Sequence, residues 1–334
     1  MAEARQSWID AVKGLTISLV VLHHVYAGVE ADMAVPAALP ALSLVLFTLR
    51  MPLFFCIAGL FAMKAIQGPW RAIVETKVLH FGYLYLIWGV IGVLCRYGLG
   101  SFAHHQVSPM SLLSLAWNPP LTLWFIYVLT VFFVIARAMR GTSPVLQIAL
   151  AMACSAYVVA NFDDRGHIVL RVLRYYPFFL IGIYASAWIQ HAAARASWTG
   201  FAGFAVAFVA LAAVALRDKL FMVPPVYYGM ALCGCGAVIA LIHLNQARAP
   251  VQLLAGIGRR SLYVYLTHFL PAAGFRILLQ KLGLHDPVAI ILIAWPLAVA
   301  SCLLFYETAR RTPLRFLFER PAPLHYHPLP VSAA

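Results

Sequence analysis

Charged side chains are scarce in this sequence of 334 residues. Only 10% of the residues are Asp, Glu, Lys or Arg, whereas 63% are hydrophobic. A water-soluble globule needs more polar surface than so few charges can supply. This scarcity excludes an ordinary soluble enzyme or binding domain and indicates that lipid is the solvent for most of the chain.

Cysteines are also few, and the six present form no Cys-x-x-Cys pair. All lie in or beside apolar segments, as small core residues do, so we expect neither a disulfide framework nor a bound metal ion. Internal repeats and a soluble domain are lacking too. We therefore expect one integral membrane domain over residues 1–320, followed by a Pro-rich cytoplasmic tail over 321–334.

Acidic residues are outnumbered, with 11 Asp and Glu against 24 Lys and Arg, for a net charge of +13. The basic residues are spread along the chain without a dense patch or a nucleic-acid-binding motif, which excludes nucleic acid as a partner. Their distribution favours contact with the headgroups of membrane lipids and with an anionic cofactor.

Long apolar runs dominate what the sequence does contain. A transmembrane helix needs about 20 mainly apolar residues, because irregular backbone cannot face hydrocarbon. Ten runs meet this pattern, at residues 9–28, 41–63, 78–97, 121–138, 144–161, 171–189, 199–216, 223–243, 261–280 and 288–308. The first has no small-residue cleavage site before Glu30, so we expect it to remain as an anchor. The sequence predicts an all-α polytopic bundle of about ten transmembrane helices.

The basic residues also predict the orientation of the bundle, because cytoplasmic loops are enriched in Lys and Arg. With the N-terminus inside, the cytoplasmic face collects Arg71, Arg140, Arg259 and Arg310 among others, and the opposite face holds most of the acidic residues. An even number of spans then makes both termini cytoplasmic. The expected location is a bacterial inner membrane.

An unusual polar stripe runs along the first apolar run. Asp10, Lys13 and His24 are ionisable, and such residues are rare within membrane spans. At about 100° per residue, Lys13 and His24 differ by only about 20° and Asp10 lies in the same sector, whereas His23 falls about 80° away. Lys13 and His24 are about 16 Å apart along the axis. Either the stripe faces a site, or Asp10 caps the helix, Lys13 reaches the interface and His24 bonds to a carbonyl.

A second charge lies within the second apolar run, where Arg50 and the helix-bending Pro52 precede an aromatic pair. Arg50 is expected at the depth of His24, so that both can line one cavity. The alternative is that Arg50 extends outward to lipid headgroups.

These two segments resemble the acyltransferase 3 family of membrane O-acyltransferases. Its first helix carries an aspartate, then Arg-Gly, then a histidine eleven residues after the arginine, and Asp10, Lys13, Gly14 and His24 occupy those places. The family's His-Met-Pro-Leu-Phe-Phe-Phe-Ile-Ser-Gly signature is similar to residues 50–59, with Arg50 for the histidine and Ala58 for the serine. Later landmarks follow in order at Leu123-Trp124-Phe125-Ile126, at 176–182, at 258–268 and at Glu319-Arg320-Pro321.

The resemblance implies transfer of an acyl group, most often acetyl from acetyl-CoA on the cytoplasmic side, to a sugar hydroxyl at the membrane or outer face. For such a reaction, a neutral His24 can act as a general base or as an acyl carrier, and Arg50 can stabilise the developing oxyanion. On the inner side, CoA phosphates would meet Lys13, Arg71 and Lys77, with Asp10 beside Lys13. Lys13 replaces the usual arginine and lacks its bidentate fork.

Two further residues are candidates for binding substrate. Trp124 matches a family landmark, although an aromatic residue at the end of a span is commonly an interfacial anchor. His268 lies within the ninth run, where it is either a cavity residue or a histidine satisfied by its neighbours in the bundle. Arg71 likewise is either a phosphate ligand or an inner-face anchor.

Two other functions compete with acyl transfer. A transporter or flippase would use His24 and Arg50 in a substrate or proton path, although we find no paired broken helices in two matching halves of the sequence. A structural or sensor protein would use its polar residues only for helix packing. The acceptor, whether a surface polysaccharide, a lipopolysaccharide, a periplasmic glucan or a lipid-linked sugar, stays open, as does acetyl versus succinyl.

Overall fold

The computed structural model of the chain describes residues 7–99, 109–116, 119, 122–162, 167–321 and 324. Over these residues it consists of helices and their connections, without a strand, which confirms the all-α class. Apart from Pro321 and Leu324, the Pro-rich tail lies outside the described residues. The domain division at residue 320 therefore stays a prediction.

The membrane-spanning helices match the predicted runs. In the described part of the chain, seven segments are long and apolar enough to cross a membrane: α1 (Ser7–Asp32), α2 (Ala38–Gly59), the continuous segment Trp70–Gly98, α7 (Pro144–Asn161), α10 (Trp198–Asp218), α11 (Pro224–Leu244) and α15 (Pro287–Ala309). Two more spans are bent pairs, α8 (Ile168–Tyr184) with α9 (Ser186–Ala194) at 70° and α13 (Ser261–Thr267) with α14 (Phe269–Lys281) at 57°. The described chain thus forms a polytopic helical bundle of up to nine full-length spans.

The fourth predicted run, 121–138, forms α6 (Trp124–Ala138), which at 15 residues is shorter than the usual length of a span. The segment Trp70–Gly98 is assembled from α4 (Trp70–Ile73), a π-helical stretch η1 (Val74–Leu79) and most of α5 (His80–Leu99). Short elements complete the fold: α3 (Met63–Gln67), α12 (Ala249–Gly258) and the 3-10 helices η3 (Pro109–Ala116) and η4 (Pro313–Leu317). Which face of the bundle is cytoplasmic stays a prediction from the basic residues.

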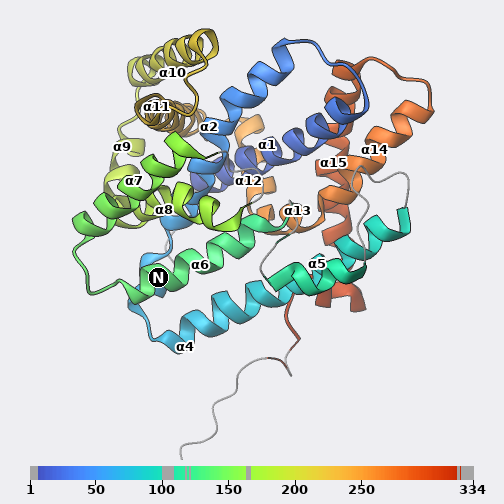
Figure 1. Cartoon of the computed structure of the whole chain (residues 1–334), viewed down its shortest axis with the longest axis horizontal. Helices are drawn as coiled ribbons and strands as arrows, with labels where there is room; N and C mark the ends of the chain where they lie inside the picture. Colours follow the sequence, from blue (N-terminus) through green and yellow to red (C-terminus); the bar gives the residue numbers. More distant parts are fainter. Residues whose placement is uncertain are drawn as a thin grey trace, which may run out of the picture.

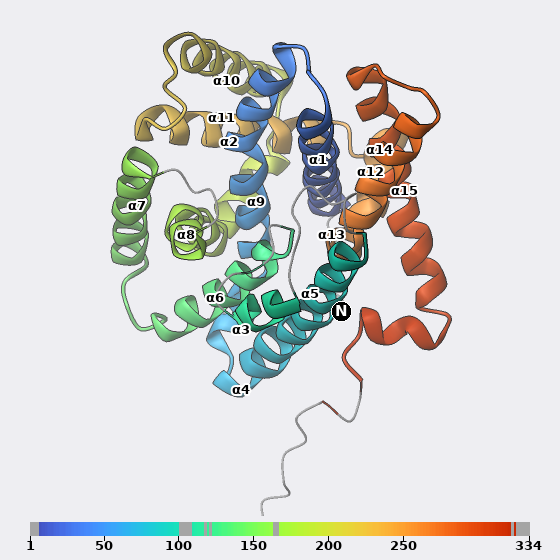
Figure 2. The same cartoon turned by 45° about the vertical axis from the view of Figure 1, so that its right-hand side comes forward.

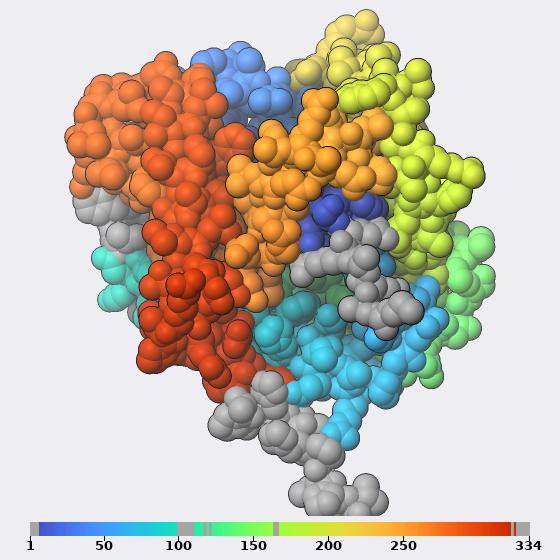
Figure 3. Space-filling model, turned by 180° about the vertical axis from the view of Figure 1, so that it is seen from behind, coloured from blue at the N-terminus to red at the C-terminus, as the bar shows by residue number. Residues whose placement is uncertain are grey.

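Helix α1 lies in the interior of the bundle. It packs against α2 and α11 on one side and against α12, α13, α14 and α15 on the other, and Figures 1 and 2 show it between α2 and the orange C-terminal helices. From behind, α1 is visible only as a small dark-blue area beside orange atoms (Figure 3). Asp10 is buried, and Lys13 and His24 are partly buried, so protein surrounds most of the polar stripe of α1.

Two close helix crossings depend on glycine. In the first, a Cβ atom on Gly14 of α1 would overlap the carbonyl of Leu254, and one on Gly258 of α12 would overlap the carbonyl of Asp10. The backbones of α1 and α12 therefore touch, as small residues allow in membrane bundles. This contact explains the glycine that follows Lys13: it lets α12, a helix that the apolar runs did not predict, lie directly against the polar stripe.

The second crossing joins α2 to α8. A Cβ atom on Gly59 would overlap the carbonyl of Phe179, and one on Gly182 would overlap the carbonyl of Cys56. Both glycines end motif segments that the sequence analysis singled out, at 50–59 and 176–182. The crossing sets the spacing of α2 and α8, and so holds the helix that carries Arg50 against the bundle.

The C-terminal part of the described chain is tied to α5 and the π-helical stretch. The indole nitrogen of Trp88 donates a hydrogen bond to the Leu317 carbonyl at 2.7 Å, and the Tyr83 hydroxyl donates to the Phe316 carbonyl at 2.9 Å. Arg320 then forms an ion pair with Glu75. The Glu319-Arg320-Pro321 landmark therefore has an observed structural role, which is to fasten the chain after α15 onto η1 and α5.

Candidate functional site

One end of the polar stripe is an ion pair. The Asp10 carboxylate is buried and lies 3.8 Å from the Lys13 ammonium group. That ammonium group also lies 4.6 Å from the centre of the exposed Phe61 ring. Lys13 remains about a quarter exposed. The observed pairing follows from the spacing of three residues along a helix, which places both side chains on one face.

The other end of the stripe is a cluster of three histidines. The His24 ring lies 4.9 Å from the His268 ring and 5.4 Å from the His23 ring, measured between centroids. His268 is fully buried and occupies the break between α13 and α14. Pro271, three residues later, cannot donate a hydrogen bond to the Thr267 carbonyl, which favours a break at this point. The bend therefore places His268 against the face of α1 that carries His24.

The hydrogen bonding of His268 defines its free nitrogen. Its Nδ1 lies 2.7 Å from the Tyr265 carbonyl oxygen. A carbonyl only accepts, so Nδ1 carries the hydrogen and Nε2 of the neutral ring is left with a lone pair. This Nε2 atom is buried without a hydrogen-bond partner in the described chain. One nitrogen of His268 is therefore satisfied by its own helix, and the other has no partner among the described residues.

Two arginines act on this histidine cluster. Arg50, in α2, is 6% exposed, and its positive charge interacts with both His23 and His24. Arg96, half-buried near the end of α5, also interacts with His24. Arg50 and His24 thus lie near each other, as the sequence suggested, whereas the sequence analysis did not single out Arg96. The signal that could have identified Arg96 is the same one that identified Arg50, a charge inside an apolar run.

Trp124, the first residue of α6, packs against aromatic side chains of α2 and α8. Its half-buried ring stacks on Tyr175 at 5.7 Å and lies 6.1 Å from Phe55. The Arg171 guanidinium carbon lies 4.6 Å from the centre of the Trp124 ring. Tyr175 in turn interacts electrostatically with Arg50. Trp124 is therefore connected through Tyr175 to the region of Arg50 and the histidines.

A tyrosine also joins this region to α13. The Tyr265 hydroxyl accepts a hydrogen bond of 3.3 Å from the backbone N–H of Ile126, in the first turn of α6. The Tyr265 carbonyl holds His268, so one residue positions both the start of α6 and the second histidine. Sequence reasoning included Tyr265 only as part of a landmark and did not identify this role.

Arg71 and Lys77 come from another segment, between α3 and α5. Arg71 is exposed on α4 and is accessible to a soluble phosphate. Lys77 is half-buried in η1, and its ammonium group lies 4.8 Å from the centre of the Phe133 ring and 5.5 Å from that of Phe81. The structure thus brings Asp10 and Lys13 together, and separately His24, Arg50 and His268, whereas the part of Arg71 and Lys77 in the same site stays a prediction.

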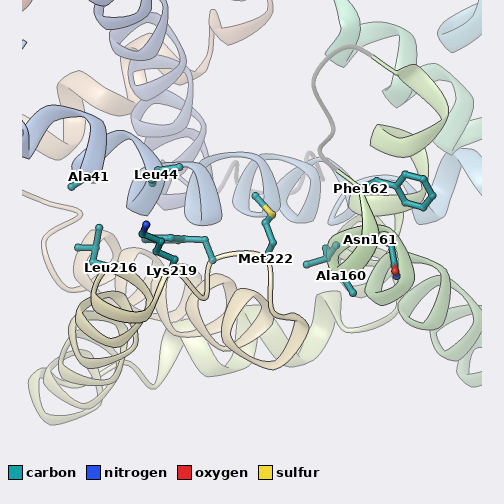
Figure 4. A pocket seen from close by; sticks show the side chains of 10 residues that line it. Ala41, Leu44, Ala160, Asn161, Phe162, Leu216, Lys219 and Met222 are labelled. Carbon is teal, nitrogen blue, oxygen red and sulfur yellow. The ribbon is translucent and has the colours of Figure 1, made fainter. Parts of the chain in front are cut away.

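A groove of about 690 Å³ lies elsewhere, between α2, α7 and the segment joining α10 to α11. Figure 4 shows its mainly apolar lining, which includes Leu44, Phe162 and Met222, with Lys219 as its one cationic residue. None of the stripe residues lines it. The groove therefore does not belong to the site around His24.

Two spans of the described chain are bent. They bend sharply at Ala185, between α8 and α9, and at His268, and the apolar pattern continues through both bends, so hydropathy alone does not reveal them. Both bends lie in the C-terminal half of the chain, so they do not contradict the prediction that no broken helices are paired across two matching halves. Bent spans also occur in transporters, and the choice between the two functions must rest on other observations.

Comparison with known proteins supplies such an observation. A family model described as an acyltransferase domain matches residues 6–307, which is most of the chain. No curated protein and no solved structure gives a match. The matched range contains both ends of the polar stripe, both glycine crossings and the bend at His268.

Proposed function

Because this chain belongs to the acyltransferase 3 family and is a membrane acyltransferase, we propose that it moves an acyl group, acetyl in the first instance, from acyl-CoA to a hydroxyl group of a glycan. The glycan is a cell-surface polysaccharide or a lipid-linked sugar, and the membrane is a bacterial inner membrane. The single observation that carries this proposal is the polar stripe of α1, with the Asp10–Lys13 pair at one end and the histidine cluster at the other. The transporter or flippase alternative is not favoured by the family match.

The donor is proposed to lie along α1. Its phosphates would meet Lys13, with Asp10 positioning the ammonium group, and the exposed Arg71 and the half-buried Lys77 would add positive charge. The distance of about 16 Å between Lys13 and His24 suits an extended pantetheine arm. With the phosphates held at the Lys13 end, the thioester reaches the level of the histidines.

In the direct route, His24 takes the proton from the acceptor hydroxyl while its oxygen attacks the thioester carbonyl. The carbonyl oxygen becomes negative and is stabilised by the nearby Arg50 guanidinium. The carbon–sulfur bond then breaks, and the CoA thiolate takes the proton from His24. In the alternative route, the His24 imidazole attacks the thioester carbonyl, the carbon–sulfur bond breaks and CoA leaves as the thiol with the imidazole proton; the acceptor hydroxyl then takes the acyl group from His24 and returns its proton to the ring. His268 contributes its free Nε2 beside His24, and Trp124 offers an aromatic face to the sugar ring.

Acyl transfer can be tested directly. Membranes that contain the full chain are incubated with radiolabelled acetyl-CoA or succinyl-CoA and the glycan fractions of the host cell, and membranes without the chain serve as the control. We expect chain-dependent label in one glycan fraction, with the mass increase of an ester. Label transfer that is absent from every fraction with both donors would contradict the proposed function.

A Lys13→Gln substitution is expected to raise the KM for acyl-CoA roughly tenfold, with a smaller change in kcat, because it removes a charge-assisted contact to phosphate far from the reacting atoms. Lys13→Arg should restore the KM. Lys64→Gln, an exposed lysine of α3, is the matched control that removes one charge elsewhere. A lower kcat with an unchanged KM in Lys13→Gln would place Lys13 at the reacting end and not at the phosphates.

A further inference from the structure

Arg50 differs from every other buried arginine in the described chain. Arg276 pairs with Asp32 and Arg320 with Glu75, and Arg174 donates to the Phe162 carbonyl at 2.8 Å. The remaining two lie over tryptophan rings, Arg137 over Trp70 at 5.1 Å and Arg171 over Trp124 at 4.6 Å. Arg50 is 6% exposed and has no hydrogen bond, ion pair or aromatic ring partner among the described residues.

A buried guanidinium without a partner is costly, because the interior does not replace the water that it has lost. The groups that interact with Arg50 do not compensate for this cost. They are His23, His24 and the hydroxyl of Tyr175, and a second cation, Arg96, also acts on His24. Within the described residues, no carboxylate interacts with this group of two arginines and three histidines.

The transferred acyl group alone does not account for these two charges. CoA phosphates held at Lys13 are about 16 Å away along α1. The oxyanion of acyl transfer carries one negative charge and exists only during the reaction, whereas Arg50 and Arg96 are permanently charged. A negatively charged group of the substrate at the level of His24 would instead pair with Arg50 for as long as the substrate is bound.

We infer that Arg50 binds a carboxylate that the substrate carries next to its reacting group. This inference rests on the proposed function, and it deepens it by stating the chemical class of the substrate. The carboxylate belongs either to a dicarboxylic acyl group such as succinyl or to an acidic sugar that accepts the acyl group. Arg50 stands where the family signature that residues 50–59 resemble has histidine.

Binding of small probes to the purified full chain in detergent micelles tests the inference without turnover. S-succinyl-N-acetylcysteamine is compared with S-butyryl-N-acetylcysteamine, which has the same number of acyl carbons without the carboxylate. Methyl glucuronide is compared with methyl glucoside in the same way. None of these probes carries CoA phosphates, so each reports on the reacting end. We expect one anionic probe to bind at least about tenfold more tightly than its neutral partner, as a charge-assisted bidentate contact requires.

The pair of probes that shows the preference identifies which part of the substrate carries the carboxylate: the acyl group or the acceptor sugar. Arg50→Gln should abolish the preference and Arg50→Lys should keep part of it, because lysine retains the charge without the fork. Arg217→Gln, which removes an exposed arginine paired with Asp218 on α10, should change nothing. If Arg50→Gln does not fold, the comparison of the anionic and neutral probes on the unmodified chain still shows whether the chain prefers a carboxylate.

Equal binding within both pairs, no saturable binding of either anionic probe, or a preference that survives in folded Arg50→Gln would overturn the inference. These results are distinct from a failure of the proposed function. An Arg50-dependent preference without acyl transfer would support the carboxylate site and contradict the proposed acyl transfer. Acyl transfer without any preference would leave the enzyme and remove the carboxylate site.

Discussion

His24→Ala is expected to lower the rate of acyl transfer by about 100- to 10,000-fold, which is the usual contribution of a general base. We expect a loss at least as large if His24 carries the acyl group. The ring of His24 lies beside His23 and His268 and is within the influence of Arg50, so no neighbour sits in the same place to replace it. Alanine favours the helix, so α1 should still form. The measurement is the initial rate of label transfer from acyl-CoA at saturating donor.

His23→Ala is the matched control, since it removes an imidazole from the adjacent position of the same helix. We expect a much smaller loss of rate, because His23 lies about 80° around the helix from the stripe. Equal losses in both variants would mean that the cluster acts through its packing, and an active His24→Ala enzyme would exclude both routes. Label retained on the wild-type protein without acceptor, and lost in His24→Ala, would select the acyl-carrier route.

Among the glycine-to-alanine substitutions in the described chain, Gly258→Ala is expected to lower the stability of the protein the most. The added Cβ would overlap the carbonyl of Asp10, so the backbones of α1 and α12 must separate. Overpacking of this kind typically costs about 1–3 kcal/mol, and backbone atoms cannot turn away as a side chain can. We expect a lower midpoint of thermal unfolding in detergent and a loss of transfer activity, because the displaced Asp10 positions Lys13.

Gly256→Ala provides the control two residues earlier in α12. There the nearest atom to an added Cβ is a side-chain nitrogen of Arg259 at 3.8 Å, an ordinary contact. This substitution should leave the unfolding midpoint unchanged or raise it slightly, because alanine favours a helix more than glycine does. A Gly258→Ala protein as stable and active as Gly256→Ala would show that α1 and α12 do not cross as closely as described.

Most of the helical architecture follows from hydropathy, because a lipid solvent demands long apolar runs and leaves little choice of secondary structure. Each of the ten predicted runs corresponds to a helix or a bent pair. What the runs did not predict is α12, whose ten residues are too short to span and whose place depends on Gly14 and Gly258. Helix crossings depend on pairs of residues far apart in the chain, and a local average of hydropathy does not contain them.

The candidate site divides in the same way. The phase of α1 placed Lys13 and His24 on one face and His23 away from it, because helical periodicity is a local property that can be computed along the chain. The ionisable side chains within apolar runs marked Arg50 and His268 as residues that need a partner. Without the fold, however, neither residue could be assigned to a neighbour.

Contacts across helices settled the rest. The bend at His268 brings it beside His24, and Tyr175 links Trp124 to Arg50. Among the described residues, five of the six buried arginines have partners and Arg50 has none. These relations depend on how bent and crossing helices meet in space, and a side chain's surroundings are set by residues that are distant in sequence. The residue types and their helical phase were readable from the chain, whereas their partners came from packing.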